Sequence, residues 1–478
     1  MWKPSGSVTR LASTMTHRPL RIALIAWVIL SALIASSVIG MYLWKGQPGL
    51  NVILVTGPLS RFWITFMSVI AAWLLGGLAL WLLHSRHIDS KNALVWGGFF
   101  LVSFLYLNLL RERVQYGDLD SYILGATNLH NGEPFDSLYI YPPFWAMLLQ
   151  PLVPLGEEAF LNVLWALNLL ALMGFYWLLY AVLARYRFSR RAAALTVTLF
   201  MLANMPLLRT LYYMQVNLHV LNLIFVSMLA YPRSRLVSAF CLAVAAHLKA
   251  SPLVLALAFL LERDWRWLAW LAFFGFFFFG VTLLSDGFQP YTSYLHNLSL
   301  LNQPHGMNFR ETSFDSLFWT LSALLKFDGA WAQAGIYLSK AALGLATGLV
   351  LFRVVRSQAF HQGESANLLN ALPPLMILMN MYSPLVWEHH GLFLMLSTCA
   401  LLRLLSTPAE WTWFGLFYFV QYLIPTFDFF PWSYARMLTP LLLLWLIWRA
   451  GRREPGQPLP FMRIQYWLDS LPSPMVRP

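Results

Sequence analysis

The chain has 478 residues, of which 59% are hydrophobic and only 11% are charged, and its formal net charge is +12. A soluble domain needs roughly a quarter of its residues charged, so the composition excludes a soluble protein and predicts an all-α polytopic membrane protein. The positive charge does not indicate nucleic-acid binding, because the basic residues fall in short loops between apolar runs.

Apolar runs of about 20 residues, the length that crosses a bilayer, predict about twelve transmembrane helices, with a range of roughly 11 to 14. In chain order the predicted spans are 20–44, 62–84, 93–110, 161–184, 192–208, 216–230, 268–284, 331–352, 368–382, 391–402, 411–424 and 437–448. Two further apolar stretches, 144–155 and 236–261, are broken by prolines and by Lys249. They are expected to be interfacial or re-entrant.

Most of the 32 Lys and Arg residues fall in alternate loops, which the positive-inside rule assigns to the cytoplasm. The protein is therefore predicted to lie in the cytoplasmic membrane with both termini in the cytoplasm. Most of the 20 Asp and Glu residues fall on the outer side, where the two largest loops are 111–143 and 285–330. These two loops are expected to cap one cavity.

The densest polar cluster, Tyr116-Gly-Asp-Leu-Asp-Ser-Tyr122, follows the third predicted span directly. A carboxylate at a membrane boundary is partly desolvated, which raises its pKa and improves it as a general base. Asp118 shares a face with Tyr122 in a helix and with Asp120 in an extended segment. The structural alternative is an acidic helix start, and 120–130 is predicted to form an amphipathic helix that ends in a turn at 131–134.

Two aromatic clusters also lie at predicted outer boundaries. The prolines of Tyr139-Ile-Tyr141-Pro-Pro143 predict a rigid re-entry point, or alternatively an aromatic wall for a sugar or prenyl chain. In Tyr382-Ser-Pro-Leu-Val-Trp-Glu-His-His390, adjacent histidines point different ways on a helix, so joint ligation of one metal is poor geometry. Either histidine is a candidate donor to a phosphate or a plain interfacial residue, and no metal or other cofactor is predicted.

Four single residues add weaker signals. Gln215 and Asn217 lie at a span start, where they either satisfy the helix end or face a ligand. Lys249 lies at membrane depth, where an ionisable side chain either has a function or reaches back to the surface. Arg310 is suited to bidentate phosphate contact, with an ion pair to a neighbouring acid as the alternative.

In combination these motifs resemble glycosyltransferase family 87, a family of GT-C enzymes that includes polyprenyl-phosphate-mannose-dependent mannosyltransferases. The resemblance runs from about residue 93 to 453. Its six motifs, in order, are Asp118-Leu-Asp-Ser-Tyr122, Gly132-Glu-Pro134, Tyr141-Pro-Pro143, Gln215-Val-Asn217, Lys249-Ala-Ser-Pro252 and Ser383-Pro-Leu-Val-Trp-Glu-His-His390.

The resemblance implies a GT-C-like helix bundle at 93–453, preceded by an additional segment at 1–92 and followed by a cytoplasmic tail at 454–478. It implies an inverting hexosyltransferase that moves a sugar, mannose by family analogy, from a polyprenyl-phosphate donor to a lipid or glycan acceptor outside the cytoplasm. Asp118 is then the general base, with Asp120 as second choice. His389, His390 and Arg310 are expected at the donor phosphate. The expected substrate pocket comprises Tyr122, Tyr141, Gln215, Asn217, Lys249, Trp387 and Glu388.

This chain departs from the family pattern at both ends of the resemblance. The first two spans precede the family's usual first helix, Val386 stands where the family often has Ser, and Glu388 adds an acid beside the histidines. Two other activities remain open from the residues alone: a transporter or flippase of lipid-linked sugars, and a polymerase or ligase of surface polysaccharide.

Overall fold

The computed structural model describes residues 17–53, 59–89, 92–110, 117–137, 139–301, 311–424, 430–452 and 460–470. Within these ranges all regular secondary structure is helical, as the composition predicted. The chain divides into two compact units, one of residues 1–113 with 468–478 and one of residues 114–467.

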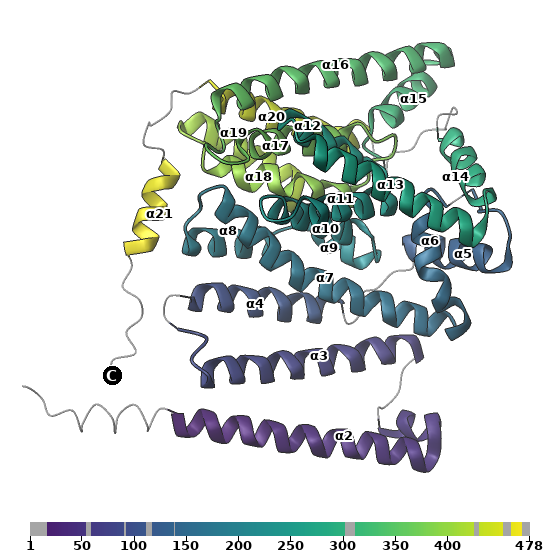
Figure 1. Cartoon of the computed structure of the whole chain (residues 1–478), viewed down its shortest axis with the longest axis vertical. Coiled ribbons are helices and arrows are strands. Elements are labelled where there is room, and N and C mark those ends of the chain that lie inside the picture. Colours follow the sequence, from purple (N-terminus) through teal and green to yellow (C-terminus); the bar gives the residue numbers. More distant parts are fainter. Residues whose placement is uncertain are drawn as a thin grey trace, which may run out of the picture. The chain divides into compact units, whose positions relative to one another are not determined.

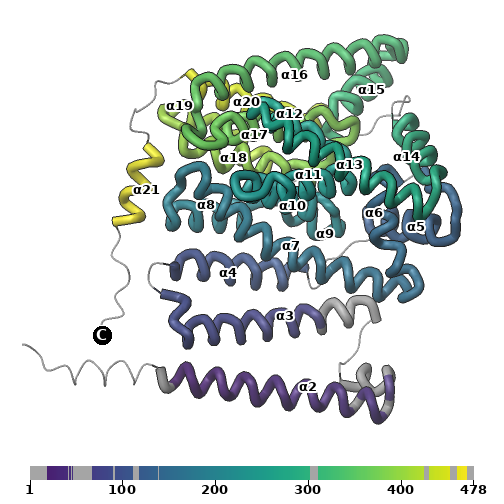
Figure 2. The backbone as a smooth tube through the Cα atoms, viewed as in Figure 1, coloured from purple at the N-terminus to yellow at the C-terminus, as the bar shows by residue number. Residues whose placement is uncertain are grey.

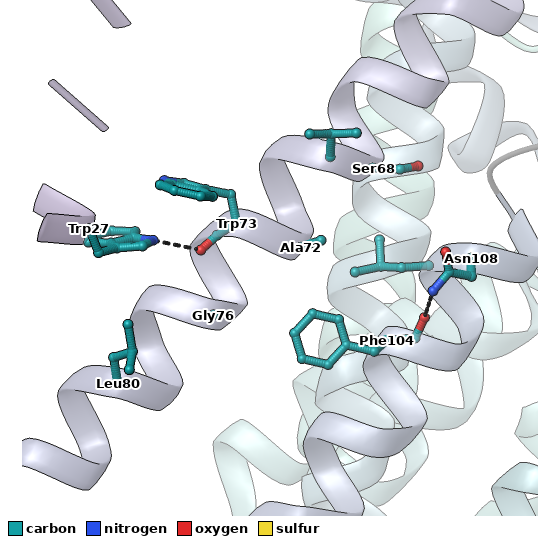
Figure 3. Close-up of a pocket in the computed structure, with 10 residues that line it drawn as sticks. Trp27, Ser68, Ala72, Trp73, Gly76, Leu80, Phe104 and Asn108 are labelled. Atoms are coloured by element: carbon teal, nitrogen blue, oxygen red, sulfur yellow. Dashed lines mark hydrogen bonds between the residues drawn. The ribbon is translucent and has the colours of Figure 1, made fainter. Parts of the chain in front are cut away.

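The first unit contains three helices that run side by side in Figure 1: α2 (His17–Ile53), which is broken at Gly46, α3 (Leu59–His84) and α4 (Ala93–Leu110). Trp27 of α2 lies so close to α3 that a Cβ atom on Gly77 would be 2.2 Å from its ring. The Trp27 indole donates a hydrogen bond to the Trp73 carbonyl (3.1 Å), beside a cavity of about 530 Å³ among the three helices (Figure 3).

The second unit contains the remaining helices, with α21 (Pro460–Ser470) crossing the boundary. They are α5 (Gly117–Asn131), α6 (Pro143–Leu149), η1 (Gln150–Leu155), α7 (Glu157–Arg185), α8 (Arg190–Leu202), α9 (Met205–Tyr212), α10 (Asn217–Ala230), α11 (Arg235–Leu248), η2 (Ser251–Leu255), α12 (Ala256–Leu261), α13 (Trp265–Asp286), α14 (Gln289–Leu300), α15 (Phe314–Leu325), α16 (Gly329–Ser357), α17 (Ala366–Met381), η3 (Glu388–Leu394), α18 (Met395–Leu402), α19 (Pro408–Tyr418), η4 (Phe419–Leu423), η5 (Trp432–Tyr434) and α20 (Ala435–Ala450).

Six helices of the described chain are long and apolar enough to cross a membrane: α2, α3, α4, α7, α13 and α16. A seventh span is formed if the bent pair α8 and α9 is taken together. All seven correspond to predicted spans. The other five predicted spans are occupied by shorter or broken helices of at most 16 residues, as in α17 and α20. Such a helix rises only about 24 Å, less than a hydrocarbon core of about 30 Å, so the count of twelve is not confirmed.

The centre of the second unit is a layer in which α10 packs against α7 and α11, and α11 packs against α13 (Figure 2). Side chains pack closely against this layer: the ring of Phe259 in α12 (Ala256–Leu261) stacks on that of Trp267 in α13, with the ring centroids 3.6 Å apart. On the outside of the same helices large apolar side chains are exposed, for example Phe276 and Leu284 of α13. Exposed apolar surface of this kind is typical of a helix that faces lipid or a partner, and together with the long apolar helices it supports a membrane protein.

Two helices of the second unit are broken, one between α8 and α9 and one after α11. Asn204 caps α9 by accepting a hydrogen bond from the Leu207 amide (2.8 Å), and the axis turns by 62° between α8 and α9. A second break follows α11, where the chain is extended at Lys249 and Pro252 begins the next short helix. The sequence predicted this second break, and the predicted short helix at 144–155 is also present as α6 and η1.

Candidate functional site

The first part of the site is the start of α5, which begins three residues before the predicted helix at 120–130 and so places Asp118 in a helix rather than in an extended segment. Asp118 is half-buried in the first turn, whereas Asp120 is exposed. Burial raises the pKa of the Asp118 carboxyl to about 6, and this rise is limited by the charge of Lys249 and by a hydrogen bond with Tyr141. Asp118 therefore has both the shielding and the neighbours that a general base needs, and Asp120 has neither.

Two tyrosines, Tyr141 and Tyr122, lie next to this carboxyl, and Trp145 packs against Tyr122. The rings of Tyr122 and Tyr141 meet edge to face with centroids 5.0 Å apart, and Trp145 lies against Tyr122 at 5.6 Å. The Tyr122 hydroxyl accepts a hydrogen bond from the Val216 amide (3.2 Å). These contacts fix α5 against the chain that enters α10, and they join Tyr122, Tyr141 and Trp145 in one aromatic cluster.

The chain before α10 contributes two amide side chains. Gln215 and Asn217 are fully buried, and their carbonyl oxygens accept hydrogen bonds from the Tyr141 hydroxyl (3.4 Å) and the Lys249 amine (2.9 Å) respectively. Neither amide nitrogen has a hydrogen-bond partner in the described part of the chain. Buried donors without acceptors are costly, so these two nitrogens are suited to a ligand that brings oxygen atoms.

The break after α11 places Lys249 opposite η3. The Lys249 Nζ lies 2.5 Å from His390 Nε2 and 5.5 Å from the centre of the Phe393 ring. The other ring nitrogen, His390 Nδ1, accepts a hydrogen bond from the Trp387 backbone amide (2.8 Å). Burial, together with Lys249, lowers the pKa of His389 and His390 well below the ordinary value, so both rings are neutral at pH 7.

The histidine pair differs from the sequence interpretation in one respect. Adjacent histidines on an α-helix point apart, but η3 is a tighter 3₁₀ helix, and the centroids of the His389 and His390 rings are 4.5 Å apart. The described residues contain no group of three His, Cys, Asp or Glu side chains arranged to hold a metal ion.

Glu388 lies beside the histidines and is held by two arginines. Its carboxylate pairs with Arg209 of α9 (3.4 Å) and with the buried Arg436 at the start of α20 (2.7 Å). Reasoning from the sequence missed both arginines. They are among the few basic residues on the predicted outer side, and that departure from the positive-inside bias was the signal that could have identified them.

A second buried carboxyl, Glu311, was also missed and lies beside the site in the segment before α15. The Thr312 amide donates to the Val386 carbonyl (2.7 Å), which places Glu311 against Trp387. Burial, and secondarily the charge of Asp315, raises the pKa of Glu311 to about 7. Arg310, the preceding residue, lies outside the described residues.

The two segments predicted to form the large outer loops contact each other. The buried side-chain amide of Asn297 in α14 donates to the carbonyls of Asp136 (2.7 Å) and Tyr139 (2.9 Å) in the first outer segment. Tyr139 in turn packs over Gly125 of α5, where an added Cβ atom would lie 2.4 Å from the ring. One asparagine and one glycine therefore fix Tyr139 between α14 and α5.

Replacing Gly125 with alanine is expected to destabilise the protein by about 1–3 kcal/mol, because the methyl group must displace the buried Tyr139 ring. The measurement is thermal unfolding in detergent. Gly280→Ala is the matched control, because Gly280 is also in a helix and has nothing within 4 Å of the added Cβ atom. An equal effect of both substitutions would contradict the packing described for Tyr139.

The structure thus brings together most of the predicted site residues. The shared site comprises Asp118, Tyr122, Tyr141, Gln215, Asn217, Lys249, His389 and His390. Trp387 and Glu388 lie beside it, and Asp120 is exposed. The site is a carboxylate and a set of nitrogen donors that face one another between aromatic walls.

A family model matches the central part of the chain. The model of glycosyltransferase family 87 matches residues 139–384, just over half of the chain. The matched segment contains Tyr141, Gln215, Asn217 and Lys249, while Asp118 precedes it and the two histidines follow it. No curated protein sequence matches the chain.

Proposed function

Because the chain belongs to glycosyltransferase family 87 and is a membrane glycosyltransferase, we propose that it transfers a hexose from a polyprenyl-phosphate donor to a lipid or glycan acceptor. Mannose is the first sugar to test. The reaction takes place on the extracytoplasmic face, where the sequence places the outer loops, and it inverts the anomeric centre. The observation that carries this proposal is the approach of a shielded carboxylate, Asp118, to the donor groups around Lys249 and His390.

Each group has a definite task in the proposed reaction. Asp118 takes the proton of the acceptor hydroxyl as its oxygen attacks the anomeric carbon. The bond from that carbon to the phosphate breaks in the same step, and charge develops on the leaving phosphate. The free amide nitrogens of Gln215 and Asn217 and the buried His390 are the donors available to stabilise that charge. The rings of Tyr141 and Tyr122 line the position of the sugar.

The donor class is tested with the purified protein in lipid nanodiscs. Polyprenyl-phosphate mannose, polyprenyl-phosphate glucose and nucleotide sugars are offered separately together with membrane lipids or glycan acceptors. We expect the protein to consume a polyprenyl-phosphate sugar and none of the nucleotide sugars. NMR of the product should then show that the configuration at the anomeric carbon is inverted. Turnover of a nucleotide sugar without a polyprenyl donor, or retention of configuration, would contradict the proposal.

Activity is expected to fall below about pH 6. The pKa of Asp118 is raised to about 6, so the carboxylate that acts as base is present above that pH and is lost as the pH falls through it. The rate at low donor concentration should drop about tenfold per pH unit below pH 6. In the Asp120→Asn variant, the transfer rate should begin to fall at about the same pH, near 6. Loss of activity at every pH in this variant would make Asp120 the base.

A further inference from the structure

The contact between Lys249 and His390 determines where their protons lie. His390 Nδ1 accepts a hydrogen bond from the Trp387 amide, so a neutral His390 ring carries its proton on Nε2. That same Nε2 is 2.5 Å from Lys249 Nζ. Two N–H groups cannot share one contact, so the bond forms only if the lysine nitrogen offers a lone pair. At pH 8, where the test below is made, the ligand-free site therefore holds Lys249 as a neutral amine, and the lysine charge that limits the pKa rise of Asp118 is present only at the acid end, near pH 6.

The other neighbours of Lys249 agree with this state. Asn217 from α10 is uncharged and accepts a hydrogen bond from the amine (2.9 Å), and η3 contributes the ring of Phe393. The titratable groups that face Lys249 are Asp118 from α5 and the neutral His389 and His390 from η3. Lys249 is thus a half-buried base with one carboxyl neighbour, Asp118.

The proposed transfer creates a charge that this amine can balance. The donor phosphodiester carries one negative charge, and the leaving phosphate monoester carries two at neutral pH. Meanwhile Asp118 has taken a proton and become neutral. A neutral amine beside both the protonated carboxyl and the new dianion is the natural next acceptor of that proton.

We infer that Lys249 is the proton acceptor behind Asp118, an inference that rests on the proposed transfer. The acceptor hydroxyl proton goes to Asp118 and then to the Lys249 amine. The new glycosidic C–O bond forms as the anomeric carbon–phosphate oxygen bond breaks, and its electron pair stays on the phosphate. Total charge is conserved, because the gain of one positive charge on Lys249 matches the second negative charge on the phosphate. Protonated Lys249 also releases His390 Nε2–H to donate to that phosphate.

Calorimetry with farnesyl monophosphate as a probe of the leaving group tests this directly. Titrations at pH 8 in two buffers of different ionisation enthalpy measure the protons taken up on binding, and the probe itself is then a dianion because its second pKa is about 6. Wild type should take up close to one proton, and Lys249→Met and Lys249→Arg should lose that uptake. Binding without uptake in wild type, or uptake that persists in both variants, would overturn the inference.

The turnover of Lys249 variants shows whether Lys249 acts as a proton acceptor or only as a positive charge. Arginine keeps a positive charge but cannot cycle through a neutral state, so Lys249→Arg should be slowed as much as Lys249→Met, by roughly 100-fold. Near-wild-type turnover of Lys249→Arg would overturn the inference. The matched controls are Lys326→Arg and Lys326→Met at an exposed position, which should have wild-type turnover. If wild type does not bind the probe at all, the polyprenyl-phosphate donor is wrong, and the inference fails with it.

Discussion

Replacing Asp118 with asparagine is expected to lower turnover by about 10³- to 10⁴-fold, the upper range for loss of a general base. Asparagine has nearly the size and shape of the native side chain, so the contact with Tyr141 and the packing of α5 can be retained. The amide cannot take the proton of the acceptor hydroxyl. The loss should therefore appear in the rate of transfer, measured as the first turnover with excess enzyme, while binding of farnesyl monophosphate stays close to wild type.

Asp120→Asn is the matched control for this prediction. Both carboxyls lie in the first turn of α5, both substitutions remove one negative charge, and only Asp118 is shielded and next to Tyr141. Near-wild-type turnover is expected for the control. A large loss in Asp120→Asn with activity retained in Asp118→Asn would reverse the assignment of the base, and full activity in both variants would remove Asp-based catalysis from the site.

The second large effect is on stability and concerns the buried ion pair between α15 and α16. Lys340 Nζ lies 2.7 Å from a carboxylate oxygen of Asp315, and the side chains are only 14% and 6% exposed. Lys340→Met leaves the Asp315 carboxylate buried without a partner, with Glu311 close enough to repel it. The expected loss is about 3–5 kcal/mol, the usual result of breaking a buried pair from one side. Thermal unfolding in detergent measures it.

The double variant Lys340→Met with Asp315→Leu distinguishes charge burial from loss of packing. Two apolar side chains of similar volume often stabilise as well as a buried pair, so the double variant should recover most of the stability lost in the single one. If Lys340→Met unfolds at the wild-type temperature, the pair is not buried as described. If the double variant is no more stable than the single one, packing around Lys340 is the cause.

The sequence predicted the long helices well because their length alone is diagnostic. The runs at 93–110 and 161–184 have no competing interpretation once about 20 apolar residues are required. Shorter runs such as 391–402 are apolar too, but there the chain forms a 3₁₀ turn followed by a two-turn helix, η3 and α18. Both η3 and α18 are buried among other helices, and a buried segment needs apolar side chains as much as a transmembrane helix does. Composition alone therefore does not distinguish the two.

Site residues that lie close together in the sequence were predicted, because helix geometry alone brings them together. Contacts between segments far apart in the chain were missed. Asp118 and Tyr122 share a face because they are four residues apart in a helix. The ion pair of Lys340 with Asp315 was not predicted, because this contact depends on how α15 packs on α16. The same holds for Glu388 with Arg209 and Arg436, which come from three elements far apart in the chain.

The hydrogen bond from the Trp387 amide to His390 has a consequence for evolution of the site. The group that orients the histidine is a peptide N–H and not a side chain, so every residue type except proline can supply it at position 387. The indole itself is 40% exposed at the edge of the site. Selection can therefore vary the side chain at 387 to suit a different sugar or acceptor while the imidazole keeps its tautomer, and among natural variants of this chain proline is the residue that should never appear there.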